Sequence, residues 1–214
     1  YSILSFFPTI DKDDILVFRA PCPFGPHEPE CKNHNLLSLG GRKFFLMVSG
    51  NRWQKNIVRA LRALDNYFDK IADCDLKVII TGSKSPLIKL RNDKRFIFID
   101  YVEGSTLDWL YKNAFCFIYP SLNEGYGYPP LQAMRYGTPV IASCTSSIPE
   151  VCADNVLYFD PRNISEIENR ILQLSTDGEL YNKLALKGSE HYKKILQSQD
   201  KDLSKLLRGI FDAR

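Results

Sequence analysis

One segment of the chain combines an acid, flexible backbone and a helix start in a spacing that suits phosphate and sugar chemistry. It is EGYGYPPLQ, residues 124–132. Gly125 and Gly127 let the backbone approach a ligand closely, and the prolines suit the first turn of a helix, whose free N–H groups and positive dipole end attract phosphate. Glu124 is well placed to accept hydrogen bonds from hydroxyl groups. The segment predicts a site for a polyol beside a phosphate.

A second segment, VSGNRWQKN at residues 48–56, adds positive charge through Arg52 and Lys55. Arginine and lysine side chains at such a position could pair with a diphosphate. Taken singly, these charged residues and the glycines of residues 124–127 also fit ordinary roles in solvated turns. The interpretation therefore depends on whether the fold brings the two segments to one place.

From residue 43 the sequence alternates apolar strands with helices, the pattern of a doubly wound domain. Residues 57–68 carry Ile57, Leu61, Leu64 and Phe68 on one helix face. We expect a Rossmann-like α/β domain, a parallel sheet with helices on both faces, in which ligands bind beyond the carboxyl ends of the strands. Both segments directly follow strands. The expected strands are 44–48, 76–81, 96–100, 115–119, 139–143 and 156–159.

Several helix boundaries have local signals. Ser105 and Asp108 resemble a capping pair for a helix at 107–114, and Ser165 with Glu168 resembles a capping box. A weaker helix is expected near 86–90, and two further helical segments close the chain. The last segment has apolar residues at helical spacing: Leu203, Leu206, Leu207, Ile210 and Phe211.

Composition narrows the class of protein. Of 214 residues, 44% are hydrophobic, enough for a packed core, and the net charge of +3 is too balanced for a dedicated nucleic-acid binder. No apolar run reaches the roughly 18 residues that span a bilayer, and no signal peptide opens the chain. We expect a soluble, cytoplasmic protein that binds no nucleic acid.

A metal site is not expected. Asp-x-Asp pairs at 11–13, 73–75 and 200–202 occupy a polar turn, the approach to a strand and a helix, and fit surface acids better than metal ligands. Four potential zinc ligands lie close together among prolines, but their spacing matches no standard zinc module. They are Cys22, His27, Cys31 and His34.

The segment YPSLNEGYGYPPLQAMRYGTPVIASCTSSIPEV resembles the donor-site signature of the group 1 (family 4) retaining glycosyltransferases of the GT-B fold. The similarity continues through VSGNRWQKN, IDYVEGSTLDWLYKNA and VLYFDP, in matching order over residues 43–175. Such enzymes have two Rossmann-like domains, and this chain resembles the C-terminal half of the GT-B fold, which binds the nucleotide sugar. The resemblance implies that residues 1–42 end a missing N-terminal domain and form a linker, that 43–196 bind the donor, and that 197–214 form an amphipathic helix. A strand is expected at residues 15–18.

The resemblance also implies roles for individual residues. Glu124 would contact hydroxyl groups of the donor sugar, and Arg52 and Lys55 would neutralise the diphosphate leaving group. Tyr101 and Val102 would lie beside the base. The full set of implied donor-binding residues is Gly50, Tyr101, Val102, Gly125, Tyr126, Gly127, Tyr128 and Gln132.

Gln132 departs from the family pattern, which places a second glutamate eight positions after the first. That acid usually contacts the ribose. Glutamine keeps an acceptor oxygen and gains donors, so binding could survive with lower strength or altered nucleotide preference.

The implied reaction is glycosyl transfer with retention of configuration, without a protein nucleophile, a metal or a cofactor; the donor substrate is a nucleotide-diphosphate sugar. The acceptor would be an unknown glycan or lipid-linked molecule, as in polysaccharide biosynthesis, with possible peripheral association at the inner face of the membrane. The chain alone is expected to be inactive, since the N-terminal domain supplies half of the site.

Two alternatives stay open: a GT-B-like nucleotide-sugar epimerase, and a non-catalytic nucleotide-sugar-binding domain, which Gln132 makes plausible. A dinucleotide oxidoreductase is disfavoured because no G-x-G-x-x-G follows the strand 44–48.

Overall fold

The computed structural model describes residues 3–11, 15, 28–39, 44–48, 52–71, 74–82 and 88–211. The chain divides into two compact units. Residues 24–193 form the unit that contains the sheet, and residues 1–23 with 194–214 form the other.

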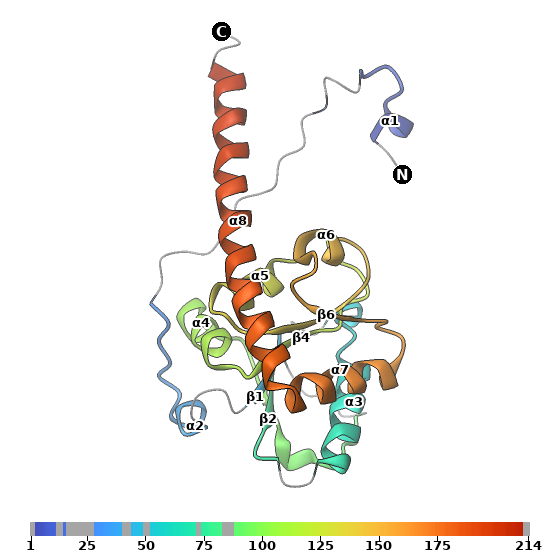
Figure 1. Cartoon of the computed structure of the whole chain (residues 1–214), viewed down its shortest axis with the longest axis vertical. Helices are drawn as coiled ribbons and strands as arrows, with labels where there is room; N and C mark the ends of the chain where they lie inside the picture. The colour runs from blue at the N-terminus through green and yellow to red at the C-terminus, as the bar shows by residue number, and fades with distance from the viewer. Residues whose placement is uncertain are drawn as a thin grey trace. The chain divides into compact units, whose positions relative to one another are not determined.

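A parallel sheet of six strands, in the order β3-β2-β1-β4-β5-β6, organises the larger unit (Figure 1). Every neighbouring pair of these strands runs parallel. The strands are almost entirely apolar because helices cover both faces. The six strands expected from residue 43 onward are confirmed, with ends that shift by no more than a residue. They are β1 (Phe44–Val48), β2 (Lys77–Thr81), β3 (Phe96–Ile99), β4 (Cys116–Tyr119), β5 (Val140–Ser143) and β6 (Leu157–Phe159).

Helices connect these strands, and further helices precede β1 and follow β6 in the chain. Short ones are α1 (Ile3–Phe6), α2 (His34–Leu37), α6 (Ile148–Cys152) and the single 3₁₀ turns η2 (Trp53–Lys55) and η3 (Asp93–Arg95). The longer ones are α3 (Ile57–Lys70), α4 (Gly104–Asn113), α5 (Tyr128–Arg135), α7 (Ile164–Thr176) and α8 (Gly178–Phe211).

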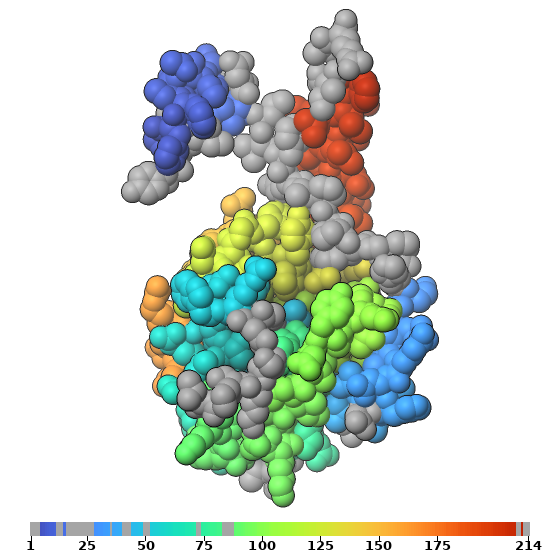
Figure 2. Space-filling model, turned by 180° about the vertical axis from the view of Figure 1, so that it is seen from behind, coloured from blue at the N-terminus to red at the C-terminus, as the bar shows by residue number. Residues whose placement is uncertain are grey.

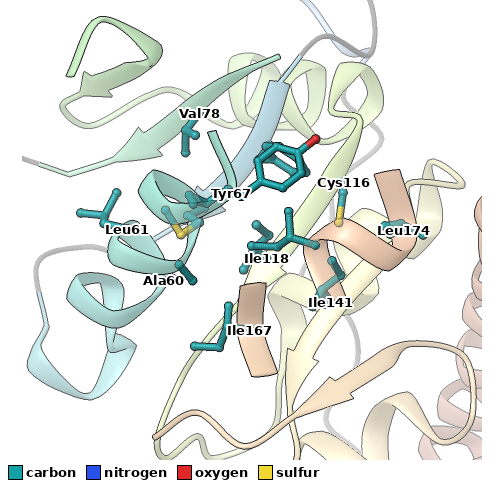
Figure 3. Packing of buried hydrophobic residues seen from close by; sticks show 14 of the residues in the cluster. Ala60, Leu61, Tyr67, Val78, Cys116, Ile118, Ile141, Ile167 and Leu174 are labelled. Atoms are coloured by element: carbon teal, nitrogen blue, oxygen red, sulfur yellow. The ribbon is translucent and has the colours of Figure 1, made fainter. Parts of the chain in front are cut away.

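Two helices, α3 and α7, cover one face of the sheet and enclose a hydrophobic core (Figure 3). Leu61 of α3 and Ile167 of α7 are fully buried there together with Ile118 of β4. The expected apolar helix face at residues 57–68 therefore packs as predicted. Burial of each such aliphatic side chain stabilises the fold by about 1.5–3 kcal/mol.

The opposite face of the sheet carries α4 and α5. Trp109 of α4 stacks on Phe44 of β1, with ring centroids 6.4 Å apart. Tyr111, also on α4, meets Phe117 of β4 edge-on at 5.2 Å. Because successive strand residues point to opposite faces, the same strands supply both cores. The expected Rossmann-like α/β arrangement, with helices on both faces, is confirmed.

Both predicted capping pairs are wrong. Helix α4 begins earlier than expected, with Glu103 in extended conformation at its N-cap, so Ser105 lies inside the first turn and Asp108 is buried. Helix α7 is capped by Asn163, whose side chain accepts a hydrogen bond from the Glu166 N–H at 3.1 Å.

Glu168 has a tertiary role in place of the capping role. Its side chain is only 7% exposed and forms an ion pair with Lys70 at the end of α3. Glu168, which the local pattern assigned to the helix start, therefore lies in the contact between α3 and α7.

The closing part of the chain also differs from the expectation. The two final helical segments are one continuous helix of 34 residues, α8, in which Gly188 sits against Met134 of α5. Residues 88–90, where the end of a weak helix was expected, are not helical. Of the strand expected at 15–18, only residue 15 is described, and it is not in a strand.

The described residues contain neither a candidate metal site nor a candidate membrane-spanning helix. No group of three or more potential ligands gathers among them, and within the same residues no helix combines the length and apolar composition needed to cross a membrane. Two of the four candidate zinc ligands, Cys22 and His27, lie outside the described residues.

Candidate active site

The two segments singled out in the sequence meet at the point where the strand order reverses. From β1 the chain continues outward to β2 and β3, then returns to place β4 on the other side of β1. Loops leaving the carboxyl ends of two such strands diverge, and ligands bind in the crevice between them. Figure 2 shows the segment that follows β1, in cyan, beside the yellow-green segment that follows β4.

Lys55 and Glu124 form an ion pair across this crevice. The Lys55 Nζ lies 2.7 Å from the Glu124 Oε1, and each side chain is only 16% exposed. Lys55 also lies over the ring of Tyr119, 5.2 Å from its centroid, and 3.5 Å from its hydroxyl. A charge-assisted hydrogen bond of this length is roughly twice as strong as a neutral one.

Glu124 is held in its ionised form. Burial by itself would raise the pKa of this carboxyl group, but the hydrogen bond and charge of Lys55, together with the hydroxyls of Ser121 and Tyr119, lower the pKa below its usual value. Burial and the nearby Glu124 charge raise the pKa of Tyr119, so its hydroxyl stays protonated. At neutral pH the site therefore presents a carboxylate that accepts hydrogen bonds and an ammonium that attracts anions.

Asn56 fixes the position of the loop that carries Lys55. Its buried side-chain amide donates to the carbonyl oxygens of Pro120, after β4, and Pro161, after β6, at 3.0 and 2.8 Å. Its backbone is left-handed, with φ 54°, a conformation that asparagine tolerates better than most residues. A backbone bond of 2.7 Å from the Leu122 N–H to the Gln54 carbonyl joins the same loops. Asn56 was not among the site residues expected from the sequence.

The glycines of residues 124–127 have different structural requirements. Gly127 has φ 120°, which only glycine adopts readily, and it is buried at the N-cap of α5. Gly125 is exposed, and a Cβ there would meet no atom within 4 Å. Packing within the protein therefore does not require a glycine at position 125.

The start of α5 offers fewer N–H donors than expected from the sequence. Pro129 and Pro130 occupy its second and third positions and have no N–H. The residues with an N–H group at this helix start are therefore Gly127 and Tyr128. The ring of Tyr128 lies beside that of Tyr126, with centroids 4.8 Å apart.

Two serines after β5 hold the backbone of residues 124–126, and the sequence analysis did not identify them. The Ser146 hydroxyl lies 2.7 Å from the Glu124 carbonyl oxygen and also accepts from the Glu124 N–H at 3.2 Å. The Ser147 hydroxyl donates to the Tyr126 carbonyl at 2.7 Å. The one available signal was a pair of small hydroxyl residues in the turn that follows a buried strand.

A pocket of about 320 Å³ lies at the carboxyl ends of β1, β2 and β3. Tyr101 and Val102, expected beside the base, both line it, and Tyr101 is 94% exposed. An exposed aromatic ring at the edge of a largely apolar pocket is suited to stacking on a planar base. The remaining lining residues are Val48, Thr81, Gly82, Asp100 and Leu107.

Two expected site residues that the structure describes, Arg52 and Gln132, are not drawn into this arrangement, and the position of a third is not described. Arg52, directly before η2, is exposed and pairs with no group among the described residues. Gln132 lies half-buried on α5, and its side chain makes no hydrogen bond in the described part of the chain. Gly50 lies outside the described residues.

The described site thus offers an ammonium, a carboxylate, glycine N–H groups and an apolar pocket along one edge of the sheet. An ammonium and backbone N–H groups can hold a phosphate, a carboxylate can orient sugar hydroxyls, and the pocket can hold a base. Together they fit a ligand that contains all three parts.

Comparison with known proteins identifies the family of this chain. The sequence pattern of "Glycosyl transferases group 1" matches residues 32–191. Among curated relatives, the O-antigen chain mannosyltransferase B of Escherichia coli is 42% identical over 80 residues, which are 37% of this chain and 21% of that protein. The O-antigen chain mannosyltransferase RfbU of Salmonella typhimurium is 29% identical over 121 residues, 55% of this chain and 34% of that protein. The chain thus spans about a fifth to a third of these relatives.

Solved structures share the fold at low sequence identity. A sucrose-phosphate synthase from Thermosynechococcus elongatus superposes with a TM-score of 0.69 at 19% identity, over 88% of this chain and 50% of that one. The C-terminal domain of a glycosyl transferase group 1 family protein from Francisella tularensis gives 0.64 at 20% identity, over 82% and 97%. The family match covers most of the chain and agrees with the fold: this chain belongs to the group 1 glycosyltransferases, which have the GT-B fold.

Proposed function

We propose that this chain is the donor-binding half of a retaining glycosyltransferase that moves a sugar from a nucleoside diphosphate to a glycan or lipid-linked acceptor. Two of the relatives are named as O-antigen mannosyltransferases, and mannose is therefore the first sugar to test. The family match supports the transferase over the epimerase and over a non-catalytic binding domain.

The observation that carries the proposal is the Lys55–Glu124 pair at the switch point of the sheet. The Lys55 ammonium would contact the diphosphate and keep its ion pair with Glu124. Glu124 would accept hydrogen bonds from the sugar hydroxyls, and Tyr101 would stack on the base. Arg52 would reach the diphosphate from the exposed side.

In the proposed reaction the bond from the anomeric carbon to the β-phosphate oxygen breaks, and that oxygen keeps the electron pair. The acceptor oxygen bonds to the same face of the sugar and gives its proton to the leaving phosphate. Negative charge grows on the diphosphate as the bond breaks, so a preorganised ammonium and N–H groups stabilise the transition state more than the ground state. The proposal requires no metal and no protein nucleophile.

Titration calorimetry with GDP, UDP, ADP, CDP and dTDP, each with EDTA present, tests the binding step. We expect one of these nucleotides to bind with a Kd below 1 mM, a limit that corresponds to about 4 kcal/mol. Binding that appears only when a divalent ion is added, or no binding by any of the five, contradicts the proposal.

Two glycine variants provide a matched comparison. Gly125→Ala should fold normally, because its Cβ would meet no protein atom, yet weaken nucleotide binding where the phosphate approaches the backbone. Gly127→Ala should lower stability by about 1 kcal/mol or more, because alanine is strained at φ 120°. If Gly125→Ala binds the nucleotide with unchanged affinity, the diphosphate does not bind beside residue 125.

Transfer itself belongs to the whole protein. Because the acceptor domain is a separate half in this family, we expect residues 1–214 alone to bind the donor without transferring sugar. Robust transfer by this chain to an added acceptor would contradict that division of labour.

A further inference from the structure

We infer that Ser147, with Ser146, acts as a positioning residue that aims two backbone N–H groups of residues 124–127 at the donor diphosphate. The inference rests on the proposed function and adds to it a group outside the crevice itself. Both serines belong to the turn between β5 and α6, and neither was expected to have a role in the site.

The two serines hold two backbone carbonyl groups. Ser147 Oγ lies 2.7 Å from the Tyr126 carbonyl oxygen and 3.1 Å from that of Glu124. Ser146 Oγ lies 2.7 Å from the same Glu124 oxygen. The peptide groups 124–125 and 126–127 are therefore both fixed with their carbonyls toward the β5–α6 turn.

The geometry of the peptide bond fixes the direction of the N–H groups in these two peptides. In a trans peptide the C=O and N–H of one group point in opposite directions, and no cis bond occurs in the described chain. The N–H groups of Gly125 and Gly127 belong to those two peptides. They must therefore point away from the serines, on the same side of the loop.

Neither of these two N–H groups has an acceptor among the described residues. In the part of the chain that the structure describes, neither Gly125 nor Gly127 donates a backbone hydrogen bond, although Gly127 is buried. A buried N–H without a partner costs free energy unless a ligand or water accepts from it. Backbone N–H groups that point to one side of a loop, as those of Gly125 and Gly127 do, form a concavity that binds anions.

The consequence is that the serine hydroxyls set the direction of the anion-binding groups without touching the ligand. Removing the Ser147 hydroxyl frees the Tyr126 carbonyl to turn, and the Gly127 N–H turns with it. Affinity for the diphosphate should fall, while affinity for the base and ribose should stay the same.

The test compares Ser147→Ala and Ser147→Thr with the wild-type chain, using the diphosphate that binds best in calorimetry and its parent nucleoside. Ligand-observed NMR measures the nucleoside, because it detects millimolar binding. We expect Ser147→Ala to bind the diphosphate about tenfold more weakly, equivalent to about 1.4 kcal/mol, with nucleoside affinity unchanged within about twofold. Ser147→Thr keeps a hydroxyl and should restore diphosphate affinity to within about threefold.

Ser175→Ala is the matched control, because Ser175 makes a comparable 3.0 Å bond to the Leu172 carbonyl inside α7, away from the crevice. It should leave both affinities unchanged. Should Ser147→Ala fail to fold, Ser147→Cys, with a weaker donor of similar size, replaces it and should show the same selective loss.

Two results would overturn the inference: unchanged diphosphate affinity in the variant, or an equal loss for nucleoside and diphosphate, which indicates a merely structural role. Failure of the wild-type chain to bind any diphosphate would instead overturn the proposed function, and the inference with it.

Discussion

Replacing Lys55 by methionine should lower stability at neutral pH. Methionine keeps most of the side-chain length but leaves the Glu124 carboxylate, 16% exposed, without its cation. Exposed ion pairs contribute about 0.2–1 kcal/mol, and removing one partner of a fully buried pair costs about 3–5 kcal/mol. A pair of this exposure lies between these limits, so we expect Lys55→Met to cost about 1–3 kcal/mol.

A double-mutant cycle with Glu124→Gln isolates the pairwise term. Glutamine still accepts a hydrogen bond from Lys55, so the single change should cost less than Lys55→Met. In the double variant no charge remains buried, and the second substitution should cost less than it does alone. The expected coupling energy is about 1–2 kcal/mol, measured by urea unfolding at pH 7 followed by circular dichroism.

The pH dependence gives an independent check. The folded-state pKa of Glu124 is lowered, so the pair contributes stability above the unfolded pKa of about 4.3 and loses it as the pH falls through the folded pKa. The difference between wild type and Lys55→Met should therefore be largest near pH 7 and shrink below about pH 4.

Lys187→Met is a suitable control, because Lys187 pairs at 3.0 Å with Asp154, whose side chain is 82% exposed. It should leave stability unchanged. A coupling energy below about 0.5 kcal/mol, the usual limit of additivity, or a Lys55→Met effect equal at pH 7 and pH 3.5, would refute the reasoning.

Three further predictions concern single positions. If Gln132 reaches the ribose, Gln132→Glu should preserve or strengthen binding of the best nucleotide and Gln132→Ala should weaken it; calorimetric Kd values that agree within about twofold, roughly 0.4 kcal/mol, place it outside the site. Asn56→Ala should cost about 2–4 kcal/mol in urea unfolding, because it orphans two carbonyls and strains φ, and Asn56→Gly should cost less; equal costs would exclude backbone strain. Burial raises the pKa of Asp65, but hydrogen bonds from Asn92 and Arg91 lower its folded pKa below the usual value. The stabilisation by Asp65 should therefore be present above about pH 3.9 and disappear as the pH falls through the folded value. A difference in unfolding free energy between wild type and Asp65→Asn that stays constant from pH 7 to pH 3 contradicts this.

The local sequence determined the strands and the loops that carry the chemistry. A strand buried on both faces must be a continuous apolar run, as at residues 44–48, whatever its neighbours are. Lys55 and Glu124 follow such runs, so their place at the carboxyl edge of the sheet could be predicted. The left-handed backbone at Gly127 was likewise signalled by its residue type.

Helix starts were less predictable, because capping patterns compete with tertiary contacts. Ser165 and Glu168 have the right spacing for a capping box, yet Lys70, almost a hundred residues earlier, attracts Glu168 into the contact between α3 and α7. Asn163 then caps the helix in their place. Local spacing contains no information about a partner that packing brings from another helix.

Only the tertiary structure decided which residues meet. Hydrophobic runs do not encode strand order, and it is the pairing of β1 with β4 that brings Lys55 within 2.7 Å of Glu124. The pairing of β4 with β5 likewise brings Ser147 to the Tyr126 carbonyl. Hydrogen bonds of this kind depend on positions set to a few tenths of an ångström by the whole sheet. The sequence therefore specified the chemical groups of the site, and the order of the strands specified their partners.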